Sequence, residues 1–101
     1  MNNEKRRALE AAGFVFEDAE DFLELTVEER RLVELRVAVS RALRARREQQ
    51  QLTQEQVARK LKSSQSRVAK MEAGVPDVSL DLMFRGLFAL GGSLKDLRLG
   101  P

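Results

Sequence analysis

The apolar residues of this chain recur at steps of three and four, the spacing that places them on one face of an α-helix. The pattern is clearest from Leu32 through Leu35, Val39 and Leu43. Strands would instead alternate apolar and polar residues, and that alternation is missing apart from the short apolar run at residues 14–16. A chain of 101 residues is the size of one small domain. We therefore expect an all-α fold, arranged as a compact helical bundle.

Residues that favour helix N-caps indicate where the helices begin. Side chains of this type, which accept a hydrogen bond from a backbone N–H group of the first turn, are Thr26, Thr53, Ser64, Ser79 and Ser93. Gly74 is placed to end the helix that Ser64 begins. The expected helices cover residues 5–12, 18–25, 26–49, 53–61, 64–71 and 79–90, with a last short turn from residue 93 to about residue 100. We expect two units, a helical extension over residues 1–31 and a compact unit over residues 32–101.

Charge is distributed unevenly along the chain, although the total is only +2. Residues 1–31 contain five basic and nine acidic side chains, a net charge of −4. Residues 36–70 contain ten basic side chains and two acidic ones, a net charge of +8. The basic middle favours a polyanionic partner such as nucleic acid, and the acidic head favours a basic partner. The alternative is that these charges only solvate the exposed faces of helices.

The chain contains neither cysteine nor histidine. Their absence excludes disulfides, thiol nucleophiles, imidazole general bases and most zinc sites, so we expect no enzyme, no cofactor and no metal site. No apolar run approaches the roughly 20 residues needed to cross a bilayer, and the charged N-terminal residues do not form a secretory signal. We therefore expect a cytoplasmic protein with no membrane partner.

Two short helices joined by a tight turn are expected in the basic middle of the chain. The small Ala58 in the first helix and the apolar Val68 in the second suit a close crossing, which describes a helix-turn-helix. The residues LTQEQVARKLKSSQSRVAKMEAG (52–74) and PDVSLDLMFRGLFALGGSLKDL (76–97) resemble the Xre family of phage-repressor-like (Cro/CI-type) helix-turn-helix regulators. The resemblance covers the chain from about Leu43 onward. It implies a helix-turn-helix of the phage-repressor type and a sequence-specific DNA-binding transcriptional regulator.

The resemblance also implies roles for individual side chains. The helix that begins near Ser64 lies in the major groove, and three of its residues face base edges: Gln65, Ser66 and Lys70. Arg67 reaches a base or a phosphate. Phosphate contacts come from residues at the starts of two helices: Thr53, Gln54 and Ser64. Arg47 and Glu72 form an internal ion pair. The alternative for the polar residues is that they only face solvent.

Two residues depart from the family pattern. Lys62 stands where the family usually has the glycine of the turn, and Gln51 replaces a frequent glycine before Leu52. If Lys62 must adopt a positive φ, it costs about 1 kcal/mol relative to glycine. The geometry of the turn is therefore the point at which this chain can differ from the family.

A dimer is expected because one recognition helix reads few base pairs. We expect a homodimer on a palindromic operator, with two recognition helices about 34 Å apart to match successive major grooves. Apolar residues near the C-terminal end provide a candidate dimer surface: Leu87, Phe88, Leu90, Leu94, Leu97 and Leu99.

The first 42 residues lie largely outside the helix-turn-helix resemblance. Their acidic residues and phenylalanines resemble the arrangement in HigA-type antitoxins, which repress their own operon and bind a small ribonuclease toxin. This second resemblance implies autorepression and a small basic toxin as a partner, with candidate contacts at Glu20, Asp21 and Glu24.

Two alternatives to these functions stay open. The N-terminal segment can instead be a brace that enlarges a small core by packing four apolar residues on the long helix: Phe14, Phe16, Phe22 and Leu25. The chain as a whole can instead be a helical protein-interaction module that has the helix-turn-helix fold without specific DNA binding.

Overall fold

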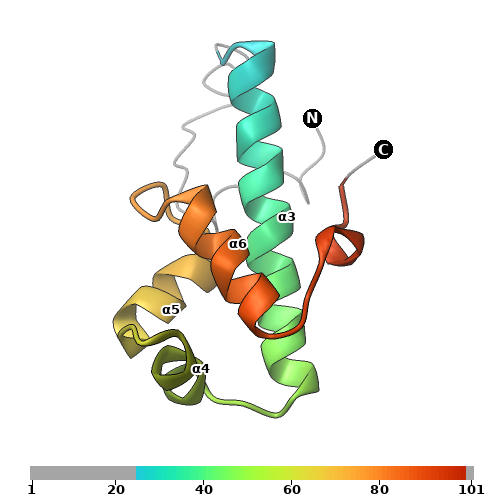
Figure 1. Ribbon diagram of the computed structural model, residues 1–101. Coiled ribbons are helices and arrows are strands. Elements are labelled where there is room, and N and C mark those ends of the chain that lie inside the picture. Colours follow the sequence, from blue (N-terminus) through green and yellow to red (C-terminus); the bar gives the residue numbers. More distant parts are fainter. Residues whose placement is uncertain (1–24, 100–101) are drawn as a thin grey trace.

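The computed structural model of the protein describes residues 25–99 (Figure 1). Its elements are α3 (Val27–Gln49), α4 (Gln54–Leu61), α5 (Gln65–Ala73), α6 (Leu80–Ala89) and the 3-10 turn η1 (Leu94–Asp96). The described residues contain no strand, which confirms the all-α fold. The helices expected over residues 5–12 and 18–25 lie outside the described residues, apart from Leu25.

Helix α3 begins and ends where the sequence predicts. The Thr26 hydroxyl oxygen accepts a hydrogen bond from the backbone N–H of Glu29 at 3.1 Å, and the helix ends at Gln49. Acidic residues occupy its first turn and basic residues its last, which suits the partial charges at the two ends of a helix. Helix α3 runs without a break through residue 31, so the helix itself marks no boundary there. The division of the chain into residues 1–31 and 32–101 stays a prediction.

The other predicted caps are also present. The side chains of four residues accept a backbone hydrogen bond from the first turn of the following helix: Thr53, Ser64, Ser79 and Ser93. Gly74, at a φ of 68°, ends α5 after Ala73, two residues beyond the predicted end. The last turn ends at Asp96 instead of near residue 100, because the backbone is extended at Leu97 and cannot continue the turn.

Helix α6 packs on α3 and closes the core on one side, while α4 and α5 lie near the C-terminal half of α3 (Figure 1). The largest fully buried side chains come from all four helices: Leu43, Met71, Met83, Leu87, Val39, Val57 and Val68. Ala58, at 4% exposure, lies in the same core, as expected of a small residue in the helix-turn-helix. The core therefore anchors α4 and α5 through their apolar faces and leaves their polar faces outward.

The two residues that depart from the family pattern both have the backbone conformation of glycine. Lys62 has a φ of 54° and Gln51 a φ of 56°, in the left-handed region that costs an L-residue roughly 1 kcal/mol or more. Lys62 is the C-cap of α4, and Gln51 follows Gln50, the C-cap of α3, so the chain turns at these points despite the missing glycines.

Replacing Lys62 with glycine is therefore expected to stabilise the protein. Glycine removes the strain that an L-residue has at this φ, so the free energy of unfolding should rise by about 0.5–1 kcal/mol. The melting temperature of a domain of this size should then rise by several degrees. The same change at Lys60, an exposed residue inside α4, should lower the free energy by about 1 kcal/mol, since glycine is unfavourable inside a helix. Thermal melts of the two variants that shift in the same direction would contradict the expectation.

Candidate nucleic-acid interface

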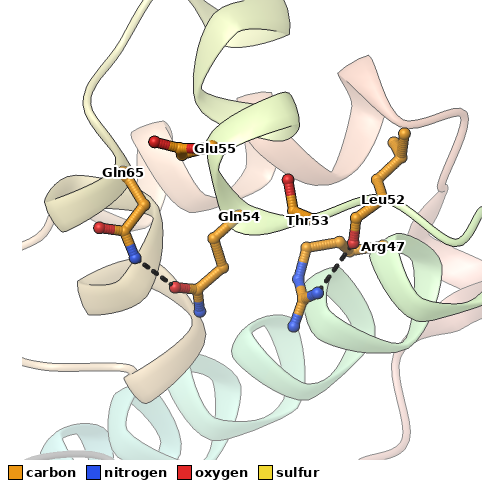
Figure 2. Close-up of a pocket in the computed structure, with 6 residues that line it drawn as sticks. All are labelled: Arg47, Leu52, Thr53, Gln54, Glu55 and Gln65. Carbon is orange, nitrogen blue, oxygen red and sulfur yellow. Dashed lines mark hydrogen bonds between the residues drawn. The ribbon is translucent and has the colours of Figure 1, made fainter.

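The first residues of α4 and α5 lie next to each other and form a shallow polar depression on the surface. Its volume is about 500 Å³, and Figure 2 shows the side chains that line it: Arg47, Leu52, Thr53, Gln54, Glu55 and Gln65. Thr53 is the N-cap of α4, and its hydroxyl oxygen accepts from the backbone N–H of Gln56 at 3.1 Å. Gln65 is the first residue of α5. Two helix starts are thus open to the same patch of solvent, and each carries backbone N–H groups without a partner in its own helix.

An ion pair between Arg47 and Glu72 supports this surface from beneath. Arg47 Nε donates to Glu72 Oε2 at 2.6 Å and Arg47 Nη2 donates to Glu72 Oε1 at 3.0 Å, with side-chain exposures of 15% and 5%. Arg47 Nη1 also donates to the carbonyl of Leu52 at 2.9 Å. The hydrogen bonds to Glu72 raise the pKa of Arg47 above its usual value, although burial opposes them. The pair ties the end of α3 to the end of α5.

A chain of hydrogen bonds continues from this ion pair to the surface. Glu72 Oε1 accepts from Gln54 Nε2 at 3.2 Å. Gln54 Oε1 in turn accepts from Gln65 Nε2 at 2.8 Å, the bond drawn between the two amides in Figure 2. Because an ionised carboxylate only accepts, Gln54 must turn its amide nitrogen to Glu72 and its oxygen to Gln65. The exposed Gln65 side chain is held by one of its two N–H groups, and its oxygen and second N–H have no partner within the described residues. Sequence reasoning paired Arg47 with Glu72 but missed this link, because Gln54 and Glu72 meet only when the helices pack.

The rest of α5 divides into a buried and an exposed side. Val68 and Met71 are fully buried in the core. The side chains implied by the family resemblance to face DNA are all exposed: Gln65, Ser66, Arg67 and Lys70. Ser64 is the N-cap, and its hydroxyl oxygen accepts from the backbone N–H of Arg67 at 3.1 Å. The structure therefore leaves exposed on α5 each of the residues that the resemblance implies for base contact.

A family model described as helix-turn-helix matches residues 43–97. The chain belongs to this family, the Xre/Cro/CI type of helix-turn-helix. No curated protein and no solved structure gives a significant match to the chain. The start of the match at Leu43 coincides with the start of the resemblance seen in the sequence. The protein is therefore a DNA-binding helix-turn-helix regulator, and its family is typically non-enzymatic.

The helix-turn-helix carries a positive surface that fits this assignment. Exposed cations lie on α4, α5 and the turn between them: Arg59, Lys60, Lys62, Arg67 and Lys70. Glu55, in the first turn of α4, is an exposed carboxylate on the same surface. An excess of positive charge of this kind favours the phosphate backbone of DNA.

The described residues show neither a metal site nor a membrane-spanning helix. In the part of the chain that the structure describes, no group of three or more acidic residues is arranged to hold a metal ion. Across residues 25–99, no helix has both the length and the apolar character required to cross a bilayer. The acidic candidates Glu20, Asp21 and Glu24 lie outside the described residues.

Proposed function

We propose that this helix-turn-helix regulator is a sequence-specific repressor that binds a palindromic operator as a homodimer and controls its own operon. The observation that carries the proposal is the chain of hydrogen bonds from Arg47 through Glu72 and Gln54 to Gln65. It holds a neutral amide in a defined orientation at the exposed start of α5. A side chain that only solvated the surface would need no such support.

Base reading follows from the chemistry of the exposed groups. The oxygen and second N–H of the exposed Gln65 side chain match the N6 donor and N7 acceptor of adenine. Lys70 donates to guanine O6 or N7, Ser66 bonds to either type of edge, and Arg67 reaches a base or a phosphate. Each well-formed bidentate pair discriminates against the wrong base by about 1–3 kcal/mol.

Phosphate contacts come from the helix starts. The N–H groups at the start of α4 and the hydroxyl of Thr53 suit one phosphate, and the start of α5 at Ser64 suits another. The amide of Gln54 already spans Glu72 and Gln65, so we assign its phosphate contact to its backbone N–H. These contacts set the position of the helix in the groove, and the bases are read by α5.

Dimerisation is supported by apolar residues that stay exposed at the C-terminal end. Phe88 is 50% exposed, Leu94 65% and Leu99 62%. Leu87 and Leu90, which the sequence also suggested for this surface, are at 0% and 2% exposure and belong to the core. We therefore assign the dimer contact to the smaller set, with the two recognition helices about 34 Å apart.

Salt dependence tests DNA binding directly. If a dimer neutralises about six phosphates, a plot of log K against log salt concentration should have a slope near −5. The probes are DNA from upstream of its own gene and a random duplex of equal length, and sedimentation in the same buffers reports the dimer. Tighter binding to the upstream DNA supports an autorepressor. Equal affinity for both duplexes, or no binding at low salt, would instead favour a helical protein-interaction module.

An antitoxin role is a second candidate, favoured by the net charge of −4 over residues 1–31. If this segment binds a small basic toxin, changing Glu20, Asp21 and Glu24 to lysine should weaken capture of a basic protein encoded beside its gene. Operator binding and the melting temperature should then stay nearly unchanged, because carboxylates that bind a partner are open to solvent in the free protein, where a charge contributes little to folding. If the segment is a brace, deleting residues 1–25 should lower the free energy of unfolding by several kcal/mol instead.

A further inference from the structure

Lys70, the last base-reading candidate on α5, has a carboxylate partner within the protein. Its Nζ lies 3.3 Å from Asp77 Oδ2, and the two side chains are 52% and 64% exposed. Asp77 lies outside α4, α5 and the turn that joins them, in the loop between α5 and α6, seven residues beyond Lys70. A negative charge is therefore placed beside a cation on the surface that faces DNA.

The loop that carries Asp77 is firmly held. The backbone N–H of Val78 donates to the carbonyl of Val75 at 3.2 Å, which closes a turn with Pro76 and Asp77 at its centre. Proline is favoured at the first central position of such a turn because its φ is already set.

A second restraint on this loop comes from α3. Arg36 Nη1 donates to the carbonyl of Val75 at 3.2 Å and to that of Val78, on the two sides of Asp77. Burial lowers the pKa of Arg36, and the negative charge of Asp77 partly opposes this. The Asp77 carboxylate thus projects from a braced turn, whereas Lys70 has a long and flexible side chain.

We propose that Asp77 is a specificity-determining residue that positions Lys70 for a base edge and withholds it from the phosphate backbone. The inference rests on the proposed function, because it assigns a partner to one of the base-reading side chains. An ammonium group has three N–H donors, so Lys70 can keep Asp77 with one and donate to guanine with the others. On non-specific DNA the Asp77 carboxylate offsets the positive charge of Lys70, which would otherwise attract a phosphate. Asp77 therefore weakens binding to DNA of the wrong sequence.

Changing Asp77 to asparagine is expected to affect random DNA more than the operator. Each released lysine adds about one phosphate contact, so the slope of log K against log salt should become more negative by about 1.8 for a dimer. Affinity for a random duplex should rise roughly tenfold at low salt, and affinity for a duplex selected by the wild-type protein from a random library should change by less than about threefold. The melting temperature should hardly move, since an exposed ion pair contributes little to stability.

Two controls separate this effect from a general loss of negative charge. Asp81→Asn removes another exposed carboxylate, whose oxygen lies 4.0 Å from Arg85 Nη2, and it should leave the preference between the two duplexes unchanged. The second control repeats Asp77→Asn in a Lys70→Met background, where the gain on random DNA should disappear. The proposal is overturned if the gain persists in that background, or if Asp77→Asn strengthens binding to both duplexes equally.

The design also distinguishes failure of the proposed function from failure of this inference. If the wild-type protein selects no duplex from the library, sequence-specific repression is wrong. The effect of Asp77 on Lys70 is then still decided by the salt slopes on random DNA with and without Lys70→Met. A selected duplex combined with unchanged slopes would instead retain the repressor and reject the role of Asp77.

Discussion

Replacing Glu72 with alanine is expected to lower the free energy of unfolding by about 3 kcal/mol, and with it the melting temperature by more than about 10 °C. The change leaves the Arg47 guanidinium, whose side chain is only 15% exposed, without its carboxylate. It also removes the oxygen that accepts from Gln54 Nε2. Loss of one partner from a buried ion pair is costly mainly because the other charge stays buried without compensation. Urea unfolding followed by circular dichroism measures the change.

Glu48 is the matched control for this prediction. Its carboxylate also pairs with an arginine, Arg44, at 3.0 Å, but the two side chains are 57% and 64% exposed. Glu48→Ala should therefore cost well under about 1 kcal/mol. Combining Glu72→Ala with Arg47→Met should recover part of the lost stability, since the uncompensated cation is then absent. If Glu72→Ala unfolds at the same urea concentration as Glu48→Ala, the ion pair does not support the fold.

Local features of the fold could be read from the sequence because each depends on a few neighbouring residues. The caps at Thr26, Thr53 and Ser64 involve a hydrogen bond across three positions, and all three are present. In such cases the side chain and the backbone group it satisfies lie in one short segment, so the pattern of residues is sufficient. The positive φ of Lys62 is different, because the sequence raised it only as a condition, from the place of a turn glycine in the family that the chain resembles.

Contacts between helices could not be predicted from the sequence in this way, because they join residues from distant segments. The apolar stripe on α6 did not show that Leu87 is buried while Phe88 is half exposed, because both fit a helix with one apolar side. The link from Glu72 to Gln54 joins residues 18 positions apart, and it depends on how α4 and α5 cross. The pairing of Lys70 with Asp77 depends on a loop whose turn is braced from α3. The sequence therefore predicted candidates for base contact and the Arg47–Glu72 pair, but it did not predict that Gln54 contacts Gln65 or that Asp77 contacts Lys70.

Replacing Gln65 with alanine should produce the largest change in DNA binding. Loss of one bidentate contact costs about 1–3 kcal/mol in each half-site, or at least about 2 kcal/mol for a dimer, so the dimer should bind its operator at least about thirtyfold more weakly. Affinity for random duplex DNA should change little, because a neutral amide neutralises no phosphate, and the salt slope should stay the same. Fluorescence anisotropy with both duplexes over a range of salt concentrations measures all three quantities. The melting temperature of the variant serves as the control for folding, since Gln65 is exposed.

Comparison with Lys70→Ala tests whether the cation at that position reads a base. That variant should also lose operator affinity, and its salt slope should change little, because Lys70 is paired with Asp77 and by our proposal neutralises no phosphate. Gln54→Ala should give a smaller operator-specific loss than Gln65→Ala, since it removes the group that orients the amide and leaves the amide itself in place. Equal losses of Gln65→Ala on operator and random DNA would show that this side chain does not read a base. The order Gln65→Ala, then Gln54→Ala, with unchanged salt slopes, is the result expected if the hydrogen-bond chain from Arg47 orients the reading residue.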